Sequence, residues 1–305
     1  MPPTLRLLDH LEDMSAVEDL QRQIWGANDV VPYPLLLTAA HNGGILLGAF
    51  DEEHLIGFAF GFPGLTHTPD GPQLKHCSHM LAVLPEYQSQ GVGFLLKRAQ
   101  WQMVRRQEIP LITWTYDPLL SRNAHLNIAR LGAVCSTYVP NMYGEMQDNL
   151  NQGLPSDRLQ VDLWVNSSRV QNRMSQSPRR QLDLAHYLSA ETGIINPTRL
   201  GAAGWPQPLP SPQSSSDELS PLPPGKALPP GEGGDPALHL LEIPADFYAL
   251  KAADPELALI WRLHVRELLE DLFTRGYLIT DFIFLKGEHP RSFYVLSDGE
   301  RKLGE

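Results

Sequence analysis

The spacing of apolar residues in the first part of the chain predicts alternating strands and helices. A short apolar run predicts a strand over 4–8, and apolar positions three or four residues apart predict a helix over 15–25. A second helix, over 34–41, is indicated by proline at its start and Asn-Gly-Gly after its end. Apolar runs over 45–50 and 55–62, separated by a short polar stretch, predict a β-hairpin.

These patterns continue after a stretch rich in Pro, Thr and Gly at 65–73, which predicts a loop. The elements expected next are a strand ending at Val83, a helix over 91–107, a strand over 111–116, a helix over 121–131 that Gly132 ends, and strands over 134–139 and 159–165. Strands and helices in this order favour an α/β fold with a mixed sheet.

The composition changes between 204 and 236, where ten of the 27 prolines lie together with serine and glycine. Such a stretch cannot bury enough apolar surface to order itself, so we expect a flexible linker or insertion. Beyond it the pattern predicts a strand over 238–243, an amphipathic helix from Leu257 to Phe273 that Gly276 ends, and strands over 278–285 and 292–296.

The expected organisation is a first domain over 1–166, a connecting segment over 167–203, the linker over 204–236 and a C-terminal α+β region over 237–305. At 305 residues the chain is long enough to bury a full core. The C-terminal region is expected either to complete a second sheet or to cover a cleft of the first domain.

Net charge, the length of apolar runs and the cysteine count limit the binding partners and the compartment that we expect. The net charge of −11 argues against a general nucleic-acid or membrane-surface binder. No apolar run approaches the roughly 18 residues that a membrane span needs, and the N-terminus does not resemble a signal peptide. Two cysteines, Cys77 and Cys135, fit a reducing compartment. We therefore expect a cytoplasmic protein, and a homo-oligomer is compatible with this sequence.

The most informative segment joins a predicted strand to a predicted helix at Gln88-Ser89-Gln90-Gly91-Val92-Gly93. A glycine loop at the start of a helix presents backbone N–H groups and the positive end of the helix dipole to an anion such as a pyrophosphate. A Walker loop needs Gly-x4-Gly-Lys, which is absent, and a dinucleotide loop needs a third glycine where Leu96 stands. The alternative is that the glycines only make a tight turn.

The loop does match the acyl-CoA pattern Gln/Arg-x-x-Gly-x-Gly/Ala of the GNAT superfamily of N-acyltransferases, and Val83-Leu84-Pro85-Glu86-Tyr87 before it matches too. The segment from Asn123 to Ala133 resembles the next motif of that superfamily. The segments 78–83, 112–119, 121–125, 143–146, 242–247 and 276–282 are similar to a bacterial group of predicted GNAT acetyltransferases that includes amino-acid N-succinyltransferases.

The resemblance implies a GNAT fold, with a mixed, mostly antiparallel central sheet flanked by helices and a C-terminal α+β extension. It implies acetyl-CoA or another acyl-CoA as co-substrate, no metal, and a small-molecule amine acceptor such as an amino acid. It also implies a set of donor-binding residues along the strand, loop and following helix: Leu81, Ala82, Val83, Gln88, Ser89, Gln90, Gly91, Val92, Gly93, Phe94 and Asn123. Asn123 could instead cap its helix, although Ser121 is the better cap by residue type.

His79 is the candidate base. An imidazole with a pKa of about 6.5 can take a proton from an ammonium group near neutral pH. Strand alternation predicts that Cys77, His79 and Leu81 share one face, with His76 on the other, so the two histidines make a poor zinc pair. The alternative is a hydrogen-bonded core histidine.

The sequence leaves open which group protonates the leaving thiolate. Many members of the superfamily use a tyrosine, but the matching position here is Ile128. Tyr116 and Tyr143 are candidate replacements, unless the thiolate leaves unassisted. Arg122 is the candidate for a substrate carboxylate, on succinyl-CoA or on an amino acid, against the alternative of a solvated arginine.

The sequence thus favours acyl transfer from acyl-CoA to a primary amine. Ile128 leaves open a non-catalytic CoA-binding or regulatory module, and the Pro-rich stretch leaves open an interaction protein. On the C-terminal helix, Arg262 and Arg266 are expected to pair with Glu270.

Overall fold

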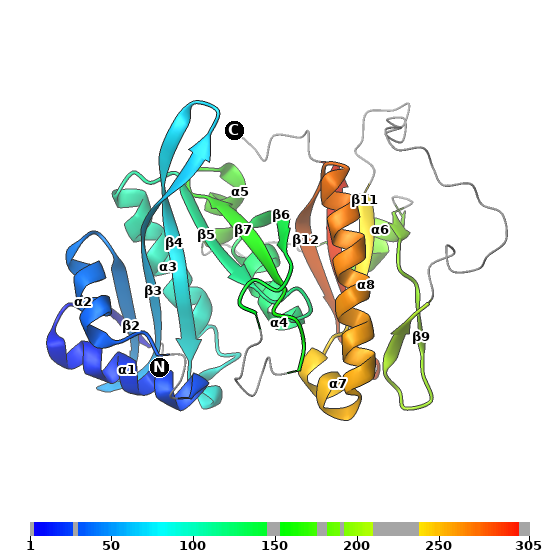
Figure 1. The fold of residues 1–305 in the computed structure, drawn as a ribbon, viewed down its shortest axis with the longest axis horizontal. Helices are drawn as coiled ribbons and strands as arrows, with labels where there is room; N and C mark the ends of the chain where they lie inside the picture. The colour runs from blue at the N-terminus through cyan, green and yellow to red at the C-terminus, as the bar shows by residue number, and fades with distance from the viewer. Residues whose placement is uncertain are drawn as a thin grey trace.

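The computed structural model describes residues 3–26, 30–144, 153–175, 182–189, 192–209 and 238–298. A sheet of eleven strands runs through these residues in the order β1-β2-β3-β4-β5-β7-β6-β12-β13-β11-β8 (Figure 1). Neighbouring strands are antiparallel except in the pairs β4–β5 and β11–β8. The predicted fold, a mixed and mostly antiparallel sheet with a C-terminal extension, is confirmed.

The first part of the chain contains the predicted strands and helices. They are β1 (Thr4–Leu7), α1 (Leu11–Trp25), α2 (Tyr33–His41), β2 (Ile45–Asp51), β3 (His54–Thr68), β4 (Gly71–Val83), the short η1 (Pro85–Tyr87), α3 (Val92–Arg106), β5 (Leu111–Tyr116), α4 (Ser121–Ala124), the π-helical segment η2 (His125–Arg130), β6 (Val134–Val139) and β7 (Arg158–Trp164).

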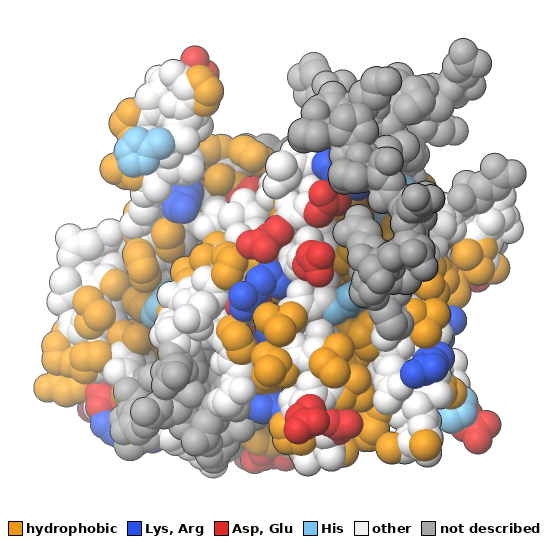
Figure 2. All heavy atoms as spheres, turned by 45° about the vertical axis from the view of Figure 1, so that its right-hand side comes forward, with side chains coloured by type: hydrophobic (Ala, Val, Ile, Leu, Met, Phe, Trp, Pro, Cys, Tyr) orange, Lys and Arg blue, Asp and Glu red, His pale blue; other side chains and the backbone are white. Residues whose placement is uncertain are grey.

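The loop expected over 65–73 is wrong. β3 and β4 stay paired out to Thr68 and Gly71, so the segment is the end of a β-ribbon that stands out from the rest of the surface (Figure 2). Leu65 and Leu74 face each other across this ribbon and are both exposed. Because the ribbon has no buried face, its sequence lacks the alternation that identifies a half-buried strand.

Helices cover both faces of the first half of the sheet. α1 lies on one face, where Trp25 meets the ring of Phe58 edge-on at 6.1 Å. α3 packs against β2, β3 and β4 on the other face (Figure 1). We call these the α1 face and the α3 face below.

The C-terminal strands continue the same sheet. The connecting segment contains α5 (Ser168–Met174), α6 (Leu184–Ser189), β8 (Gly193–Ile194) and β9 (Thr198–Leu200), followed by β10 (Pro206–Pro208). The C-terminal region contains β11 (Leu238–Ile243), α7 (Phe247–Ala253), α8 (Pro255–Thr274), β12 (Tyr277–Leu285) and β13 (Arg291–Asp298). β12 joins β6 through the pair Ile279 and Cys135. The hydrophobic core is shared as well, since Leu47 and Trp261 belong to one buried cluster. The expectation of a separate second sheet is therefore not met.

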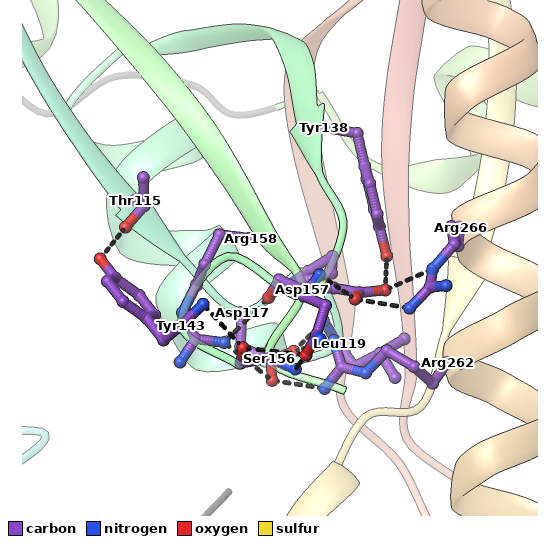
Figure 3. Close-up of polar contacts among 12 residues, drawn as sticks. Thr115, Asp117, Leu119, Tyr138, Tyr143, Ser156, Asp157, Arg158, Arg262 and Arg266 are labelled. Atoms are coloured by element: carbon purple, nitrogen blue, oxygen red, sulfur yellow. Dashed lines mark hydrogen bonds and ion pairs between the residues drawn. The ribbon is translucent and has the colours of Figure 1, made fainter. Parts of the chain in front are cut away.

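Two arginines of α8 attach it to the first half of the chain. Arg262 binds both carboxylate oxygens of Asp117, which follows β5, and Arg266 binds those of Asp157 at 2.8 and 2.6 Å (Figure 3). The expected pairing of both arginines with Glu270 is wrong. A sequence contains the helical neighbours of an arginine but not the partners that tertiary packing brings to it.

The predicted linker over 204–236 lies mostly outside the described residues. Its first part is ordered, since β10 pairs with β9 and the carbonyl of Pro206 accepts a hydrogen bond of 2.9 Å from the indole of Trp261. Within the described ranges, none of the helices has the length and apolar character that crossing a membrane requires.

Candidate functional site

β4 and β5 form a split in the sheet. They run parallel but pair at only two positions, His76 with Ile112 and Cys77 with Thr113. Beyond these pairs β4 continues to Val83, paired with β3 alone, and β5 pairs with β7 alone. A parallel pair that separates leaves backbone N–H and C=O groups of both strands facing the gap, where an extended ligand can bind them.

The glycine loop closes the wide end of this split. Ser89 and Gly91 adopt left-handed backbone conformations, with φ of 62° and 87°, which turn the chain from β4 into α3. No side chain caps α3, and its first turn leaves the N–H groups of Val92, Gly93 and Phe94 pointing out of the helix. An uncapped helix start at this place is suited to a phosphate group.

Two arginines flank the start of α3. Gln88 donates to the carbonyl of Val83 at 2.8 Å and accepts a hydrogen bond of 2.8 Å from Arg122. Arg130 of η2 lies over the ring of Phe94, 4.8 Å from its centre. Both arginines are exposed. Arg122, predicted for a substrate carboxylate, is thus placed beside the loop, and the loop residues present a setting that fits a pyrophosphate.

The strands around the split differ in polarity between their two faces. On the α3 face, Ile112 and Val161 are buried and apolar. On the α1 face, the cross-strand pairs Thr113 with Asp162 and Thr115 with Gln160 are polar, and three of these four residues are partly exposed. The α1 face of these strands is polar, partly exposed and next to the split. If the split holds one extended ligand, this face can bind a second, polar molecule beside it.

His79 lies on this α1 face. Phe60 pairs with Met80 and Gly61 pairs with Ser78, so His79 is the extra residue of a β-bulge. Its exposed ring packs against Phe60 and Phe62, with centres 6.2 and 5.9 Å apart, and the surrounding protein lowers its pKa below 6.5 by desolvation.

The bulge corrects the predicted strand alternation. Cys77 and His79 share the α1 face, and His76 lies on the opposite one, as expected. Leu81 instead points to the α3 face, where its side chain lies 3.7 Å from the position a Cβ of Gly93 would take. One inserted residue reverses the alternation of all positions after it.

The burial of Tyr116 argues against it as a proton donor. Its side chain is buried at the junction with β13, where its hydroxyl lies 3.2 Å from that of Tyr294, and burial raises its pKa well above the ordinary value. Tyr143 is exposed, and its hydroxyl lies 3.2 Å from the hydroxyl of Thr115 on the α1 face (Figure 3). Glu145 and Met146, which follow it, lie outside the described residues.

The helix after β5 differs in detail from its prediction. Ser121 is not its cap, since its hydroxyl binds that of Ser292 at 2.7 Å, and the cap position is Leu120. Asn123 is partly exposed and, among the described residues, its side chain makes no hydrogen bond. Ile128 is fully buried. η2 is π-helical, a conformation that often occurs at functional sites.

A buried polar cluster was missed by the sequence analysis. Lys97 of α3 donates to the hydroxyl of Ser78 at 2.6 Å, and this hydroxyl donates to the side-chain carbonyl of Gln100 at 2.7 Å. The ammonium also lies 3.7 Å from the ring centre of Trp114. Burial lowers the pKa of Lys97 to about 7. The only signal in the sequence was a lysine next to Leu96 in the apolar stripe of its helix.

Comparison with known families identifies the first part of the chain. Residues 14–125 match the profile of the family described as "Acetyltransferase (GNAT) family". This range includes the split, the loop and α3. The match supports a GNAT domain within these residues and the expected class of enzyme, whereas the domain bounds of 1–166 and the likeness to amino-acid N-succinyltransferases stay predictions.

Comparison with curated proteins finds no significant match. Among solved structures, Arabidopsis thaliana NAA60 in complex with acetyl-CoA is 16% identical, with a TM-score of 0.45, over 54% of this chain and 99% of that one. A ribosomal-protein alanine N-acetyltransferase from Escherichia coli is 14% identical, with a TM-score of 0.41, over 59% and 99%. An aminoglycoside 6′-acetyltransferase of type Ii is 16% identical, with a TM-score of 0.41, over 58% and 99%.

Proposed function

We propose that this chain, whose residues 14–125 match the acetyltransferase (GNAT) family, transfers an acyl group from a CoA thioester to the primary amine of a small molecule, with an amino acid as the preferred acceptor class. The observation that carries the proposal is the uncapped start of α3 at the wide end of the β4–β5 split, with Arg122 and Arg130 beside it.

The donor would lie along the split. The pyrophosphate would accept hydrogen bonds from the N–H groups between Gln90 and Phe94, with Arg122 as a charged neighbour. The pantetheine arm would follow β4 from Val83 toward Ser78, bound to backbone groups that β5 does not use, and a backbone N–H near Leu81 or Ala82 would polarise the thioester carbonyl. Asn123, whose side chain is not otherwise bonded in the described part, would reach the same arm.

The acceptor would approach over the α1 face. Its nitrogen would attack the thioester carbon directly, so that a C–N bond forms and the C–S bond breaks. Asp162 gives an ammonium group an anionic neighbour on this face, since it stands opposite Thr113. His79 would take the proton of the amine, directly or through water, because its lowered pKa leaves the imidazole neutral near pH 7.

The rival function is CoA binding without turnover. It is favoured by one observation, that the position matching the usual catalytic tyrosine holds the buried Ile128. Calorimetry with CoA and a thiol-release assay with acetyl-CoA and succinyl-CoA over a panel of amines separate the two functions. Thiol release that depends on an amine supports the transferase, and tight CoA binding without release supports the rival. If neither acyl-CoA nor CoA binds, both functions are excluded.

A further inference from the structure

The ammonium group of Lys97 lies at the point where β4 and β5 separate. Ser78 and Trp114 are the first residues of the two strands beyond their last pair. Lys97 donates to the hydroxyl of Ser78 at 2.6 Å, and its ammonium lies 3.7 Å from the centre of the Trp114 ring. One side chain from α3 thus contacts both strands at the narrow end of the split, opposite the glycine loop.

This ammonium is buried without an acid beside it. Lys97 is 5% exposed, and among the described residues no carboxylate forms an ion pair with it. The titratable group that faces it is His76 on β4, which is neutral because burial lowers its pKa to about 3. A buried charge without a counterion lowers stability, so a fold that retains one has a reason other than stability.

Two further polar groups around the ammonium are also without partners. Gln100 accepts a hydrogen bond from Ser78 through its side-chain carbonyl, but its amide nitrogen is buried and bonds to nothing in the described part of the chain. Neither ring nitrogen of the buried His76 has a partner there. Nε2 of His76 and Nε2 of Gln100 both lie against Gly61. Since buried polar groups normally have partners, this cluster has a surplus of donors and lacks an anionic acceptor.

A donor bound as proposed above would point its acyl chain toward this cluster. The arm would follow β4 from Val83, and the thioester carbonyl would bind a backbone N–H near Leu81 or Ala82. The sulfur then lies on the Val83 side of the carbonyl, and the acyl chain continues on the other side, toward Ser78. Because the acceptor amine approaches over the α1 face, the acyl chain has the α3 face, from which Lys97 comes.

The distance from the carbonyl to the ammonium suits a short chain with an acid at its end. Leu81 and Ser78 pair with β3 residues that are only two positions apart, because the bulge lies between them. Two strand steps are about 7 Å. A four-carbon diacid extends about 5 Å from its carbonyl carbon to its carboxylate oxygens, and a hydrogen bond adds about 3 Å. An acetyl group would end short of Lys97.

We propose that Lys97 binds the terminal carboxylate of the acyl group, so that the preferred donor is the CoA thioester of a four-carbon dicarboxylic acid. The inference names the donor class of the proposed transferase and rests on that function. The carboxylate accepts hydrogen bonds from the ammonium of Lys97 and from the amide nitrogen of Gln100. It thereby supplies the anionic partner that these groups lack among the described residues.

The protonation of Lys97 should report this pairing. Burial lowers the pKa of the ammonium to about 7, and a carboxylate at hydrogen-bond distance raises it again. Binding of succinyl-CoA should therefore draw a proton from solvent into the complex at a pH above 7. Butyryl-CoA, which has the same four carbons without the acid, should not.

The test compares succinyl-CoA with butyryl-CoA as donors for the same amine. The wild type should favour succinyl-CoA in kcat/KM by about 10²-fold, as expected for hydrogen bonds to a buried charge. Lys97→Met keeps the length of the side chain and removes the charge, and in this variant the preference should disappear. Lys75→Met, on the part of β4 before the split, is the matched control and should keep the wild-type ratio.

Proton uptake gives a readout that does not depend on turnover. Calorimetry of succinyl-CoA binding at pH 8, in buffers of different ionisation enthalpy and without an amine, should show uptake of about one proton by the wild type. Binding of butyryl-CoA to the wild type, and of either donor to Lys97→Met, should show none.

The outcomes separate the inference from the proposed function. A wild type that prefers butyryl-CoA, or a folded Lys97→Met that keeps the wild-type ratio, overturns the inference while the transferase function stands. If Lys97→Met does not fold, the wild type decides, since the inference requires both its preference for succinyl-CoA and the proton uptake. A wild type that releases no thiol from acetyl-CoA, butyryl-CoA or succinyl-CoA with any amine removes the proposed function, and the inference with it.

Discussion

Arg262 of α8 holds both carboxylate oxygens of Asp117 although 145 residues separate them along the chain. Both side chains are buried, and the pair lies where β5 ends (Figure 3). It therefore ties the C-terminal region to the strand that forms one side of the split. The two parts of the chain are connected through charged groups as well as through the shared sheet.

Loss of this pair should destabilise the whole chain. Arg262→Ala leaves Asp117 buried with the amide of Leu119 and the more distant Arg158 as its remaining partners, and should cost about 3–5 kcal/mol of unfolding free energy. Urea unfolding measures the change. Arg275→Ala, which breaks an exposed pair with Asp271, should cost under about 1 kcal/mol. Similar losses in the two variants would contradict a structural role for the buried pair.

Much of the fold followed from local patterns, because most strands of the first half pair with a neighbour in sequence and several carry runs of buried apolar residues. The predictions that failed concerned long-range contacts or a segment without a buried face. The ribbon ending at Thr68 has both faces exposed, and the partners of Arg262 and Arg266 come from distant segments. No periodicity in a sequence indicates either feature.

In the candidate site too, local features could be predicted from the sequence and long-range contacts could not. The loop from Gln88 to Gly93 could be predicted because it is a local pattern of consecutive residues, and Gly91 takes the left-handed conformation that its turn requires. The face of Leu81 was predicted wrongly, because the bulge at His79 depends on the register with β3. The contacts of Lys97 depend on where α3 crosses two strands that separate, a relation that sequence spacing does not contain.

The stability of the wild type should depend on the protonation of Lys97. Its pKa is about 7 when folded and 10.5 when unfolded, so between these values the unfolded chain holds more protons and stability rises with pH. The slope contributed by this group is at most about 1.4 kcal/mol per pH unit. In urea unfolding from pH 6 to pH 10, Lys97→Met should be more stable than the wild type at pH 6, and the difference should shrink toward pH 10. A difference that is constant across this range would contradict the lowered pKa.

His79 should act only as the neutral imidazole. His79→Ala should lower kcat by about 10²-fold near pH 7, and the acidic limb of the wild-type profile should lie below pH 6.5, because desolvation lowers the pKa of the ring. The profile of kcat/KM against pH measures the limb. His67→Ala, on the projecting ribbon, is the control and should leave the profile unchanged. An acidic limb that persists in His79→Ala would show that another group takes the proton.

A substitution of Arg122 should show whether this arginine binds a phosphate of CoA or the carboxylate of an amino-acid acceptor. It lies 2.8 Å from Gln88, so its removal should weaken binding of CoA by about tenfold, a loss of about 1.4 kcal/mol. Calorimetry of Arg122→Ala with CoA measures this, and pantetheine, which has the arm but no phosphate, should bind the variant and the wild type alike. Arg122→Lys should recover part of the affinity, because an ammonium keeps the charge and loses the fork. If Arg122 instead bound the carboxylate of an amino-acid acceptor, the affinity for CoA would be unchanged and KM for the acceptor would rise. The contact with Gln88 at the start of α3 favours the first result.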